Sequence, residues 1–144
     1  MHINMPIMLL CFTVRKPGTT FQEYKAYYEQ HHSKNIYGFL GDDSPSSYSR
    51  HYVERPSDEN SSHIEANGSP ALFITGKAQD FEYDGITIMT WDDEAAFTNM
   101  TIKFSDPDVI RQFTEDEEKF LDRSKIVLLS VGEIPVPPPD CRAL

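Results

Sequence analysis

The sequence lacks most of the residues and motifs that bind metals, nucleotides or thiol partners. It contains only two cysteines, Cys11 and Cys141, too few and too differently placed for a disulfide framework or a thiolate metal site. It also has no glycine-rich phosphate loop, no H-E-x-x-H motif and no G-x-S-x-G motif. The sequence therefore predicts no metal site and none of the common nucleotide or serine-nucleophile sites.

Basic residues are scarce as well. Lys and Arg number 13 against 23 Asp and Glu, which gives a formal net charge of −10. Nucleic acids and anionic membranes attract basic surfaces, so neither is expected as a partner. No apolar run is long enough to span a bilayer, and residues 1–12 have neither a basic n-region nor a small-residue cleavage site. These absences predict a cytoplasmic protein.

Four segments have the pattern of β-strands. Residues 7–14 and 126–131 are apolar on both alternating faces, which is typical of strands covered on both sides. Residues 49–54 and 83–91 complete the set, and Asp84 shares one face of its strand with two isoleucines. Residues 56–70 are rich in Ser, Asn, Asp and Pro and predict a surface loop. Residues 71–76 are expected to form a short strand or a helical turn.

Helices are predicted between these strands. Thr20 and Glu23 form a capping box, and the helix that they begin should run over residues 21–38. Capping residues at 92–93 and 105–108 predict two more helices. Asp122 and the acidic run 115–118 are expected on a solvated helix face. At about 100° per residue, the first helix has one largely aromatic stripe. It contains Phe21, Tyr24, Tyr28, His32, Asn35 and Phe39.

The order of these elements predicts an α+β fold with the ferredoxin-like layout β-α-β-β-α-β, one antiparallel sheet with helices on one face. Two strands are nevertheless apolar on both faces, so the second face needs another cover. A second copy of the same sheet would provide it, which predicts a homodimer of the dimeric α+β barrel type. Residues 1–134 should form this domain, and the proline-rich residues 135–144 an extended arm.

Three segments resemble the EthD domain family. Residues 15–32 match its opening, a Lys-Pro-Gly-like turn and a capped helix followed by Glu, two variable residues and His, so that His32 falls on the family histidine. Residues 83–97 and 114–122 look similar as well, and the resemblance covers roughly residues 7 to 132. One position departs from the pattern, because Lys34 stands where many members have proline.

The resemblance implies a function. Fungal members from aromatic-polyketide gene clusters are assigned as decarboxylases or dehydratases that use neither metal nor organic cofactor. By this resemblance the chain is expected to be a cofactor-independent lyase of secondary metabolism that acts on a hydrophobic aromatic polyketide intermediate. Two alternatives stay open: an oxygenase of the same fold, cofactor-free or haem-dependent, and a non-catalytic small-molecule-binding protein.

His32 is the predicted general acid and base, because imidazole exchanges protons near physiological pH. Tyr28, one helical turn earlier, is expected to donate a hydrogen bond to a substrate carbonyl. His51 and Asp84 lie on strands of one sheet and form a candidate acid–base pair. The alternative for His32 and Tyr28 is a structural role in the core, and the alternative for Asp84 is a solvated position at the end of its strand. The remaining predicted substrate contacts are Tyr24, His31, Asn35 and Trp91.

Overall fold

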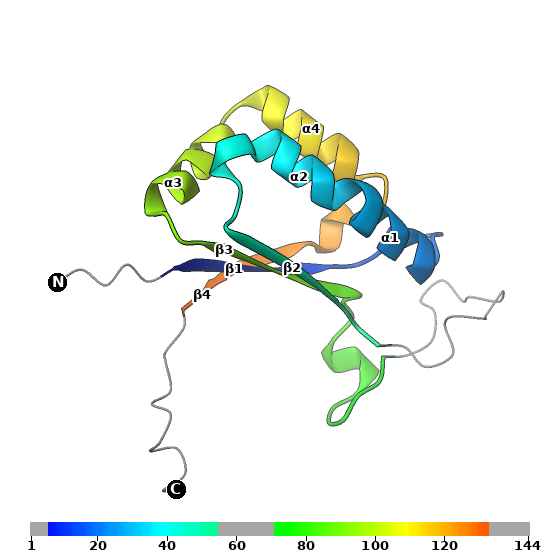
Figure 1. The fold of residues 1–144 in the computed structure, drawn as a ribbon. Helices are drawn as coiled ribbons and strands as arrows, with labels where there is room; N and C mark the ends of the chain where they lie inside the picture. The colour runs from blue at the N-terminus through cyan, green and yellow to red at the C-terminus, as the bar shows by residue number, and fades with distance from the viewer. Residues whose placement is uncertain (1–5, 55–70, 133–144) are drawn as a thin grey trace, which may run out of the picture.

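The computed structural model describes residues 6–54 and 71–132, and these residues form the predicted α+β fold (Figure 1). Four strands make one antiparallel sheet in the order β2-β3-β1-β4, which is the ferredoxin-like arrangement. Each observed strand lies within two residues of its predicted bounds. The strands are β1 (Ile7–Thr13), β2 (Ser47–Tyr52), β3 (Gly85–Trp91) and β4 (Val127–Val131).

The first helical segment is continuous but not uniform. It consists of α1 (Phe21–Tyr27), a π-helix η1 (Tyr28–His32) and α2 (Ser33–Leu40). The predicted capping box is present, since Glu23 N–H donates to the Thr20 hydroxyl at 3.0 Å and Thr20 N–H to the Glu23 carboxylate at 3.0 Å. The segment runs to residue 40, beyond the predicted end at 38, and the π-helix was not predicted.

The other two helices cover the same face of the sheet (Figure 1). They are α3 (Glu94–Lys103) and α4 (Pro107–Glu117). Asp93 and Asp106 cap them, each through a side chain that accepts a hydrogen bond from a backbone N–H of the first turn. The predicted starts of both helices are therefore confirmed. Residues 71–76, in contrast, form neither a strand nor a helix, so that expectation was wrong. No helix in the described part of the chain is long and apolar enough to cross a membrane.

Buried residues form two clusters between the sheet and the helices. The first contains Leu9, Ile36, Leu40, Trp91, Met100 and Phe113. The second contains Tyr24, Tyr28, Phe120 and Leu121. Trp91 is almost fully buried in the first cluster and donates its indole N–H to the Asp43 carbonyl at 3.0 Å. It therefore has a structural role in the core, apart from the aromatic residues of the second cluster.

Gly85 allows α1 to approach the sheet closely. The Tyr24 hydroxyl lies directly above this glycine and is hydrogen bonded to the Thr13 hydroxyl at 2.6 Å. A Cβ atom at residue 85 would collide with the Tyr24 hydroxyl. The strand therefore has a glycine at this position because a helix side chain occupies the space above it.

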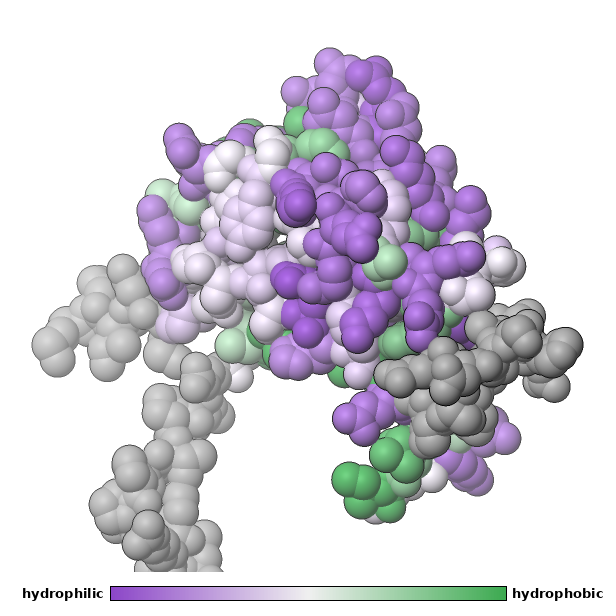
Figure 2. Space-filling view, turned by 45° about the vertical axis from the view of Figure 1, so that its right-hand side comes forward, coloured by the Kyte–Doolittle hydropathy of each residue, from purple (hydrophilic) through white to green (hydrophobic). Residues whose placement is uncertain are grey.

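The other face of the sheet is open. The strand register places on it side chains from three strands: Met8, Leu10, Phe12, Ile86, Ile88, Val127, Leu129 and Val131. These side chains are half-buried or exposed, and Leu129 is 39% exposed. The segment 71–83 packs the rings of Phe81 and Tyr83 against Phe12 at one end of this face. In Figure 2 the helix layer is mainly hydrophilic, and hydrophobic surface is visible below it.

Candidate functional site

His32, the last residue of η1, is buried beside α4. Its side chain is 7% exposed, and its Nδ1 lies 2.5 Å from the Asp116 Oδ2 on α4. Two aromatic rings hold the imidazole from its sides, Tyr28 edge-on at 5.1 Å and Phe120 at 4.8 Å between centroids. The predicted histidine is therefore fixed in orientation by a carboxylate and by packing.

Asp116 is the centre of a buried hydrogen-bond cluster. Besides His32, the Tyr27 hydroxyl donates to its carboxylate at 2.6 Å and the Asn35 side-chain amide at 2.9 Å. Burial raises the pKa of this carboxyl, but the hydrogen bonds from His32, Tyr27 and Asn35 together outweigh burial and hold the pKa below its ordinary value. Asp116 is therefore an ionised acceptor for the imidazole.

The prediction that residues 115–118 form a solvated face was wrong for Asp116, which is only 4% exposed. A signal in the sequence was available. Phe113, Asp116 and Phe120 are spaced by three and four residues, so they share one side of a helix, and both phenylalanines are buried. An acidic residue between apolar residues of one helical stripe needs an internal partner.

The π-helix brings the partners of Asp116 together. In a regular α-helix, Tyr27 and His32, five positions apart, would point about 140° away from each other at about 100° per residue. In η1 the backbone N–H of Ser33 bonds to the carbonyl of Tyr28, which makes one turn wider. The Ser33 hydroxyl donates to the same carbonyl at 2.8 Å. Tyr27 and His32 consequently reach the same carboxylate, a convergence that a uniform helical period does not predict.

The hydrogen bond to Asp116 leaves the second ring nitrogen of His32 for chemistry. Because an ionised carboxylate only accepts hydrogen bonds, Nδ1 carries the proton. None of the described residues makes a hydrogen bond to Nε2. In this tautomer Nε2 is the basic nitrogen of the imidazole, while Nδ1–H is hydrogen bonded to Asp116. This arrangement suits a group that takes up and returns a proton.

Two predicted tyrosines are hydrogen bonded within the interior. The Tyr28 hydroxyl pairs with the Thr87 hydroxyl on β3, and burial raises the pKa of Tyr28 well above its ordinary value. Tyr24 is completely buried and pairs with Thr13, and burial raises its pKa as well. Both phenols are thus neutral, and in each hydroxyl pair either oxygen can be the donor. Tyr28 contacts His32, whereas Tyr24 serves the packing of α1 on the sheet.

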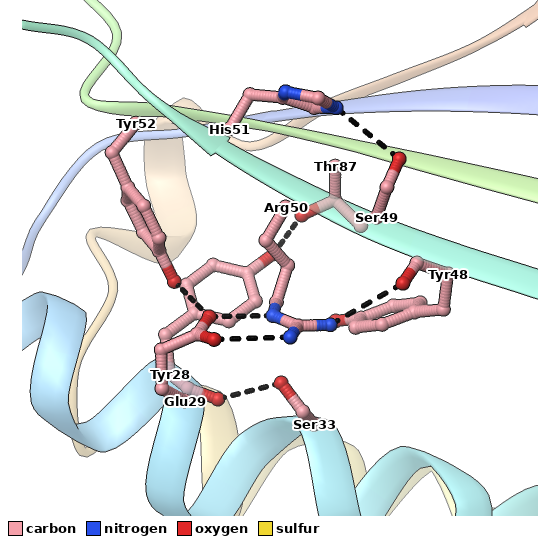
Figure 3. Close-up of polar contacts among 9 residues, drawn as sticks. All are labelled: Tyr28, Glu29, Ser33, Tyr48, Ser49, Arg50, His51, Tyr52 and Thr87. Carbon is pink, nitrogen blue, oxygen red and sulfur yellow. Dashed lines mark hydrogen bonds and ion pairs between the residues drawn. The ribbon is translucent and has the colours of Figure 1, made fainter.

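The structure does not bring His51 and Asp84 together. His51 is exposed on the open face, where its Nε2 lies 3.2 Å from the Ser49 hydroxyl (Figure 3). Asp84 is 2% exposed and accepts a hydrogen bond from the backbone N–H of Arg15 at 2.8 Å. Both residues are near the β2–β3 pairing, as predicted, but alternation along β2 turns His51 away from the helices. The predicted pairing was therefore wrong.

The remaining predicted contacts differ in their surroundings. His31 is exposed and its ring lies 5.0 Å from that of Tyr27. Asn35 belongs to the Asp116 cluster, and Trp91 to the core. Among the described residues, no group of three His, Cys, Asp or Glu side chains could hold a metal ion.

The family model of the EthD domain matches residues 16–124, which is most of the chain and includes both His32 and Asp116. The chain belongs to the EthD domain family. This confirms the resemblance of residues 15–32 and of the later segments. No protein with a curated function matches the chain.

Three solved structures illustrate the fold of this EthD protein. An EthD-like protein from Ralstonia eutropha is 13% identical, with 94% of this chain and 98% of that chain covered and a TM-score of 0.53. A protein from Arabidopsis thaliana is 10% identical, with 91% and 98% covered and a TM-score of 0.51. Hydroxynitrile lyase from Passiflora edulis is 15% identical, with 94% and 100% covered and a TM-score of 0.50. At these identities the likeness shows a shared fold.

Proposed function

We propose that this EthD protein is a cofactor-independent lyase, a decarboxylase or dehydratase, that acts on an aromatic polyketide intermediate of secondary metabolism. The observation that supports it is the buried pair of His32 and Asp116, in which Nδ1 is bound and Nε2 lacks a partner among the described residues. Fungal relatives in polyketide gene clusters suggest the substrate class. The Passiflora edulis enzyme, a lyase, has a similar fold.

His32 exchanges the proton in this mechanism. In the decarboxylation of a β-keto acid, the bond between the α-carbon and the carboxylate breaks and carbon dioxide leaves. The electron pair of that bond moves toward the ketone oxygen and forms an enolate. Protonated His32 donates its Nε2 proton to the enolate, while its Nδ1–H stays hydrogen bonded to Asp116. A positioned acid of this kind contributes on the order of 10² to 10⁴ in rate.

A dehydration uses the same groups in another order. Neutral His32 removes the acidic proton beside the carbonyl, and the resulting imidazolium protonates the departing hydroxyl, which leaves as water. The Tyr28 phenol, neutral because of its burial, is our proposed donor to the substrate carbonyl in both reactions. It would exchange its bond to Thr87 for one to the substrate.

The proposed active form is a homodimer. The open face has eight apolar side chains on three strands, and a contiguous apolar surface of this kind is typical of an interface. A second copy is the proposed cover because β4 is apolar on both faces although helices cover only one face of the sheet. Two such sheets packed face to face would form the predicted dimeric α+β barrel.

The test is incubation of the purified protein with an anthraquinone-type polyketide carboxylic acid, under air and under nitrogen, followed by mass spectrometry. Loss of the mass of carbon dioxide in both atmospheres is expected for a decarboxylase, and loss of the mass of water for a dehydratase. Either product should form at least about 10²-fold more slowly with His32→Ala. A product that forms only in air would replace the proposal with an oxygenase.

If no product forms, thermal unfolding with the same compound separates the remaining possibilities. A ligand that binds the native state raises the melting temperature by mass action. A rise without turnover would contradict the lyase proposal and favour a binding protein.

A further inference from the structure

Glu29 is the acidic residue of the Glu-x-x-His motif, but the proposed chemistry gives it no role. It lies in η1, three residues before His32. Its side chain does not join the Asp116 cluster and extends instead toward strand β2 (Figure 3). The motif therefore places one acid and one base in the same wide turn, directed at different parts of the fold.

The Glu29 carboxylate is bound by two residues of β2. Arg50 donates from Nε at 2.5 Å and from Nη2 at 3.0 Å, which is a bidentate pair, and the Tyr52 hydroxyl donates at 2.5 Å (Figure 3). The hydrogen bond from Arg50 is the main reason that the pKa of Glu29 lies below its ordinary value. Arg50 in turn donates to the Tyr48 carbonyl at 3.3 Å.

The wide turn is thus held from two sides. Glu29 binds it to the sheet, while Tyr27, His32 and Asn35 bind the same helical segment to Asp116 on α4. A π-turn is rare and occurs mostly as a single turn within an α-helix. A return of this turn to the α-helical period would rotate Tyr27 and His32 apart. The bonds of Glu29 oppose that rotation.

We propose that Glu29, Arg50 and Tyr52 are positioning residues that hold the π-turn and thereby set the bond between His32 Nδ1 and Asp116. They act through His32 and do not touch the substrate. The inference rests on the proposed function only for its effect on catalysis, because the state of the imidazole can be measured without turnover.

Four variants of the full chain test the proposal: Arg50→Ala, Arg50→Lys, Glu29→Gln and Tyr52→Phe. The control is Arg111→Ala, which removes an exposed arginine that pairs with Asp108 and Glu115 on α4. The primary measurement is the proton–nitrogen correlation spectrum of the histidine rings, with the His32 signals assigned by their loss in His32→Asn. Thermal unfolding of every variant accompanies it.

In the parent and in Arg111→Ala, we expect the Nδ1–H of His32 to give one strongly hydrogen-bonded signal. Arg50→Ala and Glu29→Gln should move or broaden this signal, and Arg50→Lys, which keeps the charge but not the bidentate geometry, should restore it only in part. Tyr52→Phe loses one hydrogen bond and should cause the smallest change. If the other variants do not fold, Tyr52→Phe is the variant that tests the proposal. A His32 signal that is unchanged in folded Arg50→Ala, or in Tyr52→Phe if the others do not fold, would overturn the proposal.

Kinetics separate this inference from the proposed function. If the parent turns over the polyketide acid, folded Arg50→Ala should lose about 10-fold to 10²-fold in kcat, with a smaller change in KM, because a misplaced group chiefly affects the reacting geometry. If the parent is inactive and the His32 signal still responds to Arg50, the positioning role stands and the proposed function fails. If the parent is active and the His32 signal does not respond to Arg50→Ala, the proposed function stands and the positioning role fails.

Discussion

On the covered face of the sheet, Thr13 and Thr87 are hydrogen bonded to Tyr24 and Tyr28 from the helix above, and His32 pairs with Asp116 nearby. The open face instead presents aliphatic side chains and Phe12 from three of its four strands. A sheet with one solvated face ordinarily has polar residues on that face. The apolar open face is therefore the unusual one, because the covered face also packs Leu9 and Trp91 into the core.

The difference suggests that the two faces have separate tasks. Buried polar groups cost free energy unless they are paired, and the hydroxyl pairs and the Asp116 cluster supply this pairing. The groups to which we assign proton exchange thus lie in fixed positions beneath the helices. We propose that the open face instead associates with a second copy of the chain.

The largest expected effect concerns the two histidines, one beneath the helices and one on the open face. His32→Ala should lower kcat on the proposed polyketide acid by about 10² to 10⁴, because it removes the proposed acid and base. His51→Ala should retain most of the rate, because this side chain is exposed on the open face and points away from the helices that carry the Asp116 cluster. Steady-state kinetics of both variants check this. Equal losses would contradict the assignment of chemistry to the covered face.

The next effect concerns the open face itself. Leu129→Glu should convert the proposed dimer into a folded monomer, because each copy would bring a carboxylate into the proposed interface. Like charges brought together at an interface cost several kcal/mol, which raises Kd about 10²-fold or more. Sedimentation velocity measures the change. Ile102→Glu on α3 is the matched control, since Ile102 is also exposed but lies on the helix side. A monomeric parent would refute the dimer.

Asp116→Asn should measurably lower the stability of the protein, because Asp116 is the acceptor at the centre of the buried cluster beneath the helices. The loss of charged hydrogen bonds is expected to lower the free energy of unfolding by about 1–3 kcal/mol at neutral pH. The pKa of Asp116 is lowered in the folded state, so its contribution is present above the unfolded pKa of about 3.9 and is lost as the pH falls through the folded value. Denaturant titrations should therefore show the two proteins converging in acid. A constant difference between them would contradict the role of the charge.

The smallest effect should come from the neighbouring Glu117, whose pKa is raised by burial despite the opposing charge of Arg123. A raised folded pKa means that stability is lost as the pH rises through it. Glu117→Gln should therefore be slightly more stable than the parent at neutral pH, by less than about 1 kcal/mol. The difference should vanish in acid, as measured by the same titrations. A less stable variant at neutral pH would indicate a favourable ionic role for Glu117.

The fold was largely predictable because its signals are local. Three helix starts are marked by side-chain chemistry that needs no tertiary contact. They are the capping box of Thr20 and Glu23, the N-cap Asp93, and the N-cap Asp106 followed by Pro107. The site was predictable only in part. His32 stands in an aromatic stripe, but its partner lies 84 positions away in an acidic run.

Two local assumptions account for the errors at the site. The assumption of a constant helical period left Tyr27 out of the His32 cluster. The π-turn that brings Tyr27 there contacts β2 and α4, which lie far away in the sequence. The pairing of His51 with Asp84 considered which strands are neighbours but not which way each side chain points. Along β2, the aromatic Tyr48 and Tyr52 mark the inner side, and His51 alternates with them.

The contact between Tyr24 and Gly85 also predicts which pairs of residues evolution can accept. A side chain at 85 has room only if the hydroxyl above it is absent, so the two positions should change together among related chains. In a library of all residues at position 85, selected for folded protein, we expect only glycine to be recovered when residue 24 is tyrosine. A library built on Tyr24→Phe should additionally admit alanine.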